Sequence, residues 1–128
     1  MKRMSKKPRT VLIVDDDAAV RSALKFALEV EGFEVRLYAG PEALLADADL
    51  PPCGCLVVDY RMPVMDGLAL IETLRARHVA LPAILITSRA NNELRRLAAR
   101  SGASQVLEKP LSDGAFIEGI RQALGACG

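Results

Sequence analysis

The chain has 128 residues, of which 51% are apolar and 26% are charged. This length and composition are typical of one globular domain and exclude a disordered or fibrous chain. Lys and Arg total 17 against 16 Asp and Glu, so no net field favours nucleic acid or an anionic membrane as a partner. No apolar run approaches the length of a membrane span.

The two ends of the sequence are predicted to be tails around a single folded domain. Residues 1–9 form a basic N-terminal tail, residues 10–125 form the domain, and residues 126–128 form a C-terminal tail. The basic start is interpreted as a solvated terminus, because no aromatic residues lie among its charges. It is not a secretory signal, since the apolar run that follows it is too short.

The cysteines are predicted to be buried or half-buried free thiols. There are three, Cys53, Cys55 and Cys127, so at least one is unpaired in a monomer, and a reducing cytoplasm fits this best. A zinc site at Cys53 and Cys55 would need a second pair of ligands, and His78 is the sole histidine.

Short apolar runs alternate with segments whose apolar residues recur every three or four positions. The runs predict strands at residues 10–14, 33–37, 56–58, 82–87 and 105–108. The recurring positions predict helices over residues 20–28, 41–45, 68–74, 94–98 and 116–124. Gly32 and Gly102 are the expected ends of the first and fourth helices, and Ser112 or Asp113 is the expected N-cap of the last. The alternation indicates an α/β fold, a parallel sheet with helices on both faces.

Polar side chains follow four of the five predicted strands. Asp15 and Asp16 follow the first strand, Asp59 ends the third, Thr87 ends the fourth, and Lys109 follows the fifth. The carboxyl ends of parallel strands share one edge of a sheet, where ligands bind in α/β folds. Clustered carboxylates suit a hard cation such as Mg²⁺, whose waters phosphate oxygens can replace, and an ammonium balances the added negative charge.

Each of these residues also has an ordinary structural interpretation. Asp17 is the expected N-cap of the first helix, Thr87 alone is a common strand end, and Lys109 alone is a common surface charge. Their joint placement at one edge favours a functional site. The isomer of the Lys109–Pro110 peptide bond stays open, because cis is accessible before proline.

Four separated segments resemble the receiver (CheY-like) domain of two-component response regulators. They are VLIVDDD at residues 11–17, VVDYRMPVMDG at 57–67, ILITS at 84–88 and EKP at 108–110. The resemblance extends from Val11 to about Leu124, and four motifs in the same order are far more specific than any one. The last three segments are most similar to receivers of the nitrogen-fixation subgroup, which precede a LuxR-type helix-turn-helix.

The resemblance implies a flavodoxin-like (βα)5 fold in which Asp59 accepts a phosphoryl group from a phosphohistidine. Mg²⁺, with Mn²⁺ as an alternative, would be bound by Asp16 directly, by Asp15 mainly through water, by Asp59, and by the backbone carbonyl of Arg61. These roles agree with the residue chemistry, since phosphoryl transfer needs alignment and charge neutralisation.

Further groups at the site would act on the phosphoryl group after it arrives. The resemblance implies that Lys109 pairs with the phosphoryl oxygens and that Thr87 moves towards them. Ser88 is small and leaves the approach open. The chain would catalyse only its own phosphorylation and dephosphorylation, and would not be an enzyme acting on a separate substrate.

The implied partners are a sensor histidine kinase or a phosphotransfer protein, in the cytoplasm and without membrane contact. The fourth helix, fifth strand and fifth helix would form the output face and a phosphorylation-dependent homodimer. No output domain is expected in this sequence, so the chain would control transcription and reach DNA only through a domain that it lacks.

Two departures from the family pattern concern signalling. Val106 stands where many members have an aromatic switch residue, so signalling is expected to use the loop after the fourth strand and the fourth helix; a normal switch with a smaller residue is an equal alternative. Arg61 and Arg89 lie two residues beyond Asp59 and Thr87, beside the route of the hydrolytic water. They either slow dephosphorylation or are ordinary solvated arginines.

Three other classes fit the sequence less well. A haloacid-dehalogenase phosphatase also uses an aspartate after a strand, but Ala19 stands where that motif has Thr or Val. No glycine-rich or Walker-type loop supports nucleotide binding. A pseudo-receiver that only binds partners is disfavoured because all five site groups are present.

Overall fold

The computed structural model describes residues 9–111 and 113–125. The predicted C-terminal tail, most of the predicted N-terminal tail and Ser112, one of the two residues predicted to cap the last helix, lie outside these residues.

Five strands alternate with five helices along the described chain. The strands are β1 (Thr10–Val14), β2 (Glu34–Tyr38), β3 (Cys55–Asp59), β4 (Ala83–Thr87) and β5 (Gln105–Glu108). The helices are α1 (Ala18–Val30), α2 (Pro41–Leu45), α3 (Gly67–Ala76), α4 (Asn92–Ser101) and α5 (Asp113–Gly125). All strand pairs are parallel, in the order β2-β1-β3-β4-β5. The predicted α/β fold with a five-stranded parallel sheet is confirmed.

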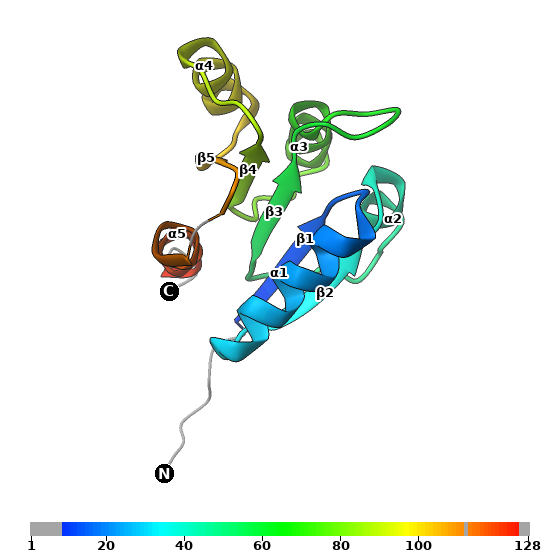
Figure 1. Ribbon diagram of the computed structural model, residues 1–128. Coiled ribbons are helices and arrows are strands. Elements are labelled where there is room, and N and C mark those ends of the chain that lie inside the picture. The colour runs from blue at the N-terminus through cyan, green and yellow to red at the C-terminus, as the bar shows by residue number, and fades with distance from the viewer. Residues whose placement is uncertain (1–8, 112, 126–128) are drawn as a thin grey trace.

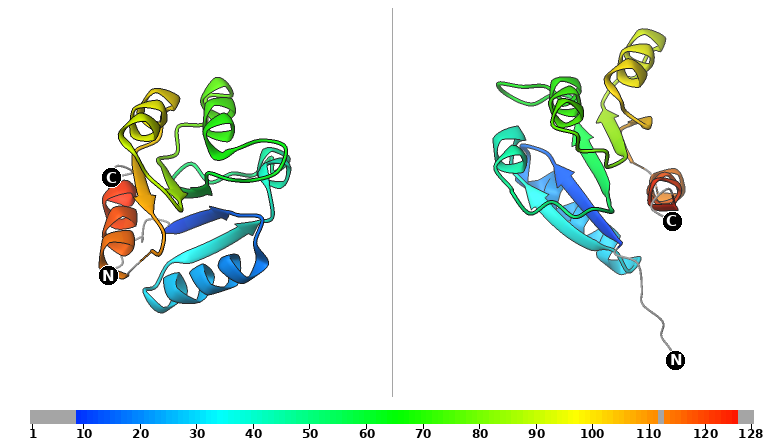
Figure 2. Two further views of the ribbon diagram at one scale, coloured as in Figure 1. Left: turned by 45° about the horizontal axis from the view of Figure 1, so that its top comes forward. Right: turned by 180° about the vertical axis from the view of Figure 1, so that it is seen from behind.

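Helices cover both faces of the sheet (Figures 1 and 2). Two apolar cores lie between the helices and the sheet, one on each face. Leu12, Leu56 and Leu85 point to the core under α2, α3 and α4. Ile13 and Ile84 point to the core under α1 and α5. Every residue of β1, β3 and β4 is buried, which explains why these strands are continuous apolar runs. β2 is a half-exposed edge strand.

Local capping fixes the helix ends next to the sheet's carboxyl edge. The Asp17 carboxylate accepts hydrogen bonds from the backbone N–H groups of Ala19 and Val20 at 2.9 and 3.3 Å, which confirms it as the N-cap of α1. Gly102 ends α4 with a φ of 101°, a left-handed conformation that favours glycine. None of the helices in the described part of the chain has the length and apolarity to cross a membrane.

The prediction of free thiols is right for Cys55 and wrong for Cys53. Cys55 is buried in β3, and desolvation raises the pKa of its thiol to about 12. Cys53 is disulfide-bonded. It lies half-buried in the segment before β3. Because disulfides are typical of oxidising environments, the cysteines no longer argue for a reducing compartment.

The strand order places a topological switch point between β1 and β3. From β1 the chain crosses to β2 on one side, whereas β3, β4 and β5 follow on the other. Connections that diverge in this way leave a crevice at the carboxyl ends of the two strands, where ligands bind in open α/β sheets. Asp15, directly after β1, and Asp59, the last residue of β3, lie at this crevice.

Candidate functional site

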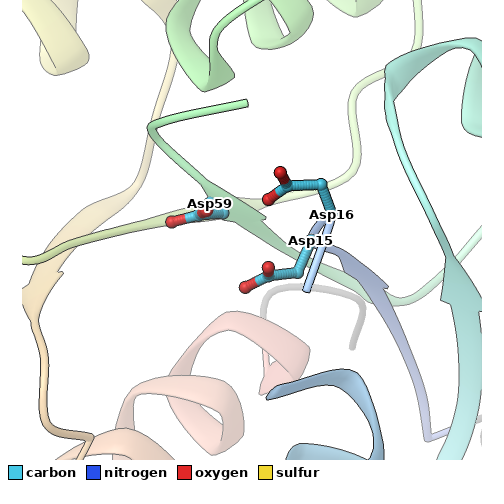
Figure 3. Close-up of side chains that lie close together, drawn as sticks. All are labelled: Asp15, Asp16 and Asp59. Atoms are coloured by element: carbon cyan, nitrogen blue, oxygen red, sulfur yellow. The ribbon is translucent and has the colours of Figure 1, made fainter. Parts of the chain in front are cut away.

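Three carboxylates meet at the switch point (Figure 3). One oxygen from each of Asp15, Asp16 and Asp59 lies within 4.8 Å of the others. Asp15 and Asp59 are only 1% and 6% exposed, whereas Asp16 is exposed. The structure therefore brings together the three side chains that the sequence predicted as metal ligands.

Asp15 is held from several sides but leaves one oxygen free. Its backbone N–H donates to the carbonyl of Tyr38, its Oδ1 accepts from the backbone N–H of Asp17 at 2.9 Å, and the Arg21 guanidinium donates to its carbonyl at 2.7 Å. Its Oδ2 is buried and has no hydrogen-bond partner among the described residues. A buried acceptor without a donor is costly, and a divalent cation near this position, or a water bound to that cation, would satisfy it. The donor set, which consists of carboxylate oxygens only, fits Mg²⁺.

Burial raises the pKa values of the two recessed carboxylates. Desolvation raises the pKa of Asp15, and the nearby charge of Asp59 adds to the increase. Desolvation also raises the pKa of Asp59, against the opposing effect of the Lys109 ammonium. Ionising both carboxylates in the folded chain therefore costs free energy, and a bound cation would offset this cost.

Lys109 and Thr87 reach the site from β5 and β4. The Lys109 Nζ lies 3.1 Å from Asp59 Oδ1, and its backbone N–H donates to the carbonyl of Thr87 at 2.7 Å. The Lys109–Pro110 peptide bond is cis. The buried Thr87 hydroxyl donates to the carbonyl of Arg89 and accepts from its backbone N–H, at 3.1 and 3.2 Å. Lys109 therefore already contacts Asp59, while the Thr87 hydroxyl is bonded within its own loop.

The remaining predicted residues surround the carboxylates at a greater distance. Arg61, Ser88 and Arg89 are exposed and line a hollow of about 530 Å³ between the loops that follow β3 and β4. The Arg61 guanidinium stacks 5.9 Å from the centre of the Tyr60 ring. Val106 is half-buried in β5, and its carbonyl accepts a hydrogen bond from Arg95 of α4. Val106 thus lies at the contact between α4 and β5 and away from the carboxylates.

Two residues that support the site were missed in the sequence. Arg21 holds the Asp15 carbonyl, and Glu108 Oε1 accepts from the backbone N–H of Ala90 at 3.4 Å. Arg21 could have been recognised from the sequence, because a cation in the first turn of a helix interacts unfavourably with the helix dipole. Such a side chain is expected to have a hydrogen-bond acceptor nearby. Glu108 carried no signal beyond its place in the EKP segment, since a charged residue before Lys109 is ordinary at a strand end.

The fold, the recessed carboxylates and the adjoining lysine and threonine define the class of phosphate-accepting receiver domains. The family model of the response regulator receiver domain matches residues 11–121. The chain belongs to this family.

Within the family, the chain is a CheY-like receiver near the FixJ subgroup. It is 40% identical over 116 residues to the transcriptional regulatory protein FixJ of Azorhizobium caulinodans, covering 90% of this chain and 54% of that protein. The C4-dicarboxylate transport regulator DctR of Rhodobacter capsulatus is 36% identical over 119 residues, 91% of this chain and 60% of that protein. The crystal structure of FixJ-N superposes with a TM-score of 0.86 at 38% identity, covering 94% of this chain and 96% of that one.

These comparisons confirm the flavodoxin-like fold and the resemblance to nitrogen-fixation regulators. They place the chain in a signalling family and not in the haloacid-dehalogenase class that the sequence left open. The chain spans only about half the length of the curated relatives it matches.

Proposed function

We propose that Asp59 is the phosphoacceptor of this receiver and takes its phosphoryl group from a phosphohistidine on a sensor kinase or a phosphotransfer protein. The observation that carries the proposal is the recessed Asp59 carboxylate, 3.1 Å from Lys109 and grouped with Asp15 and Asp16. Incubation with acetyl phosphate and Mg²⁺, followed by mass spectrometry of peptides, tests it. One phosphoryl group on the Asp59 peptide is the expected result, and modification elsewhere contradicts the assignment.

The reaction needs alignment and charge neutralisation more than acid or base catalysis. An Asp59 carboxylate oxygen forms the new bond to phosphorus, the bond from phosphorus to the donor imidazole nitrogen breaks, and the electron pair stays on that nitrogen. Lys109 exchanges its contact with Asp59 for the incoming phosphoryl oxygens. Thr87 leaves its bonds to Arg89 and donates its hydroxyl to the same oxygens.

Asp16, Asp59, the carbonyl of Arg61 and, through water, Asp15 would hold Mg²⁺ or Mn²⁺. When bound, the cation supplies positive charge that offsets the carboxylates and the phosphoryl oxygens. The orphaned Asp15 Oδ2 supports this assignment.

Addition of Mg²⁺ is expected to stabilise the chain against heat at pH 7.5. At a free concentration ten times Kd the gain is about 1.4 kcal/mol, or about 5 °C in Tm. The gain is expected to shrink as the pH falls towards 5, because the raised pKa values of Asp15 and Asp59 let protons compete with the cation at higher pH than for ordinary carboxylates. Differential scanning fluorimetry measures this.

Two single substitutions separate a specific site from general ionic stabilisation. Asp16→Asn removes an exposed ligand and is expected to abolish the Mg²⁺-dependent rise. Asp17→Asn is the matched control, because Asn caps a helix as well as Asp does and Asp17 is outside the carboxylate cluster. Equal rises in both variants contradict the metal site.

Phosphorylation would be read out on the face formed by α4, β5 and α5. The Thr87 bonds to Arg89 tie the loop after β4 to the site, and the Arg95 bond to Val106 ties helix α4 to β5. We propose that rearrangement of these bonds carries the signal in the absence of an aromatic switch residue at Val106. By analogy with the transcriptional regulatory protein FixJ, the outcome would be transcriptional. We also propose that the phosphorylated chain forms a homodimer and acts in the cytoplasm. Contact with DNA would require an output domain. The chain would act as a self-modifying switch and not as an enzyme with a separate substrate.

Arg61 and Arg89 are expected to prolong the phosphorylated state. Both are exposed and line the hollow beside Thr87, where long side chains would obstruct the hydrolytic water. Arg61→Ala and Arg89→Ala should each shorten the lifetime of the acyl phosphate, by about threefold or more. The loss of radiolabelled phosphate measures the lifetime. Arg100→Ala in the last turn of α4 is the control, and unchanged lifetimes in both test variants refute the idea.

A further inference from the structure

The loop between β3 and α3 carries an exposed apolar side chain on an unfavourable backbone. Val64 is 92% exposed and has a φ of 74°. Left-handed φ values are rare outside glycine, asparagine and aspartate, and a β-branched residue there is a genuine outlier. The domain thus holds a valine in a conformation that valine disfavours, and the side chain contributes no packing in return.

The shape of the loop imposes this conformation. The backbone N–H of Met65 donates to the carbonyl of Pro63 at 2.8 Å, and the N–H of Gly67 donates to the carbonyl of Tyr60 at 2.9 Å. These bonds close the loop on both sides of Val64. Figure 1 shows the loop projecting outward beyond the end of β3. Val64 is therefore displayed on a constrained loop.

Strain at an exposed position is typical of sites where function, and not stability, selects the residue. Asparagine or glycine would fit the same φ at lower cost. An apolar side chain that is almost fully exposed in the free chain gains favourable burial only when another molecule covers it.

The recessed nucleophile indicates which molecule that is. Asp59 is 6% exposed and lies five residues before Val64 on the same segment. A histidine on a folded domain reaches such a carboxylate only if its domain contacts the rim of the site. The residues between Asp59 and Val64 in the chain, Tyr60 to Pro63, line a hollow. A phosphodonor small enough to diffuse into the crevice needs no contact with Val64.

We infer that Val64 is a specificity-determining contact for the histidine-bearing domain of the phosphodonor protein, which buries the side chain in an apolar hollow on its own surface. The inference rests on the proposed function, since it assigns a partner contact to the Asp59 reaction. It assigns Val64 no part in the chemical step.

Val64→Asn tests the inference, because Asn tolerates the left-handed conformation and removes the apolar contact. The soluble parts of the sensor kinases encoded in the same genome are first compared, and the one that phosphorylates the wild-type chain fastest is used as the donor. Its histidine is labelled with radioactive phosphate. Transfer should slow about tenfold in kcat/KM, the effect of one lost apolar anchor. Phosphorylation by acetyl phosphate should stay within twofold of wild type, and Tm should rise by about 2–4 °C.

Val30→Asn is the matched control, with the same chemical change at an exposed valine. Val30 is 68% exposed at the last residue of α1, at the opposite end of that helix from Asp15 and Asp16. Kinase transfer within twofold of wild type in Val64→Asn, or an equal loss in Val30→Asn, overturns the inference. If the wild-type chain takes phosphate from acetyl phosphate but from no kinase, the kinase contact is wrong while Asp59 remains the acceptor. If neither donor phosphorylates it, the proposed function itself fails.

Discussion

Replacing Asp59 by Asn is expected to reduce phosphorylation by a factor on the order of a thousand or more, with acetyl phosphate and with a kinase alike. The amide has nearly the shape of the carboxylate but is not a nucleophile. It also removes the charge that faces Lys109 at 3.1 Å. Phosphate-affinity electrophoresis measures the effect, and residual phosphorylation near the wild-type rate would show that another residue is the acceptor.

The same variant should be more stable than the wild type at neutral pH when no metal is present. Desolvation raises the pKa of Asp59 despite Lys109, so the ionised carboxylate costs folding free energy at pH 7. Since the folded state binds this proton more tightly than the unfolded state, the wild type regains stability as the pH falls through the raised pKa. The difference in Tm between variant and wild type should therefore narrow with acidification. A wild type that is the more stable protein at pH 7 contradicts this account.

Gly67→Ala is expected to destabilise the chain by about 2–3 kcal/mol, or about 10 °C in Tm. A Cβ at Gly67 would lie 2.6 Å from the backbone carbonyl oxygen of Asp59 and 2.7 Å from Leu85 Cδ1. The first of these neighbours is backbone next to the nucleophile, so relief requires β3 or α3 to move. Phosphorylation by acetyl phosphate should slow as well, because the Asp59 carboxylate is displaced.

Gly114→Ala is the matched control in another helix. A Cβ at Gly114 would meet no atom within 4 Å, and alanine stabilises a helix by about 0.5–1 kcal/mol relative to glycine. Thermal denaturation of both variants should therefore move Tm in opposite directions. A Gly67→Ala variant as stable as the wild type would show that α3 does not pack tightly against the end of β3.

The sequence by itself determined the fold and the members of the site. β1, β3 and β4 are buried on both faces, so their apolar runs stood out without knowledge of their neighbours. In a parallel sheet the carboxyl ends of the strands share one edge, so Asp15, Asp59 and Lys109 could be grouped because each ends or follows a predicted strand. Helix ends at Asp17 and Gly102 were equally predictable, because capping depends on residues adjacent in the chain.

Only the tertiary structure decided how these groups are engaged. The Thr87 bonds to Arg89, the free Asp15 Oδ2 and the Arg21 bond to the Asp15 carbonyl depend on side-chain rotamers and burial. The sequence wrongly predicted a free thiol at Cys53, which is disulfide-bonded, since the spacing of cysteines does not report which sulfur atoms folding brings together. The left-handed φ of Val64 follows from the hydrogen bonds that close the loop around this residue, although valine disfavours that conformation. The spacing of apolar residues and the capping residues predict where helices and strands lie and which strand ends share an edge of the sheet. Contacts between segments that are distant in the sequence form only when the cores on both faces of the sheet are packed.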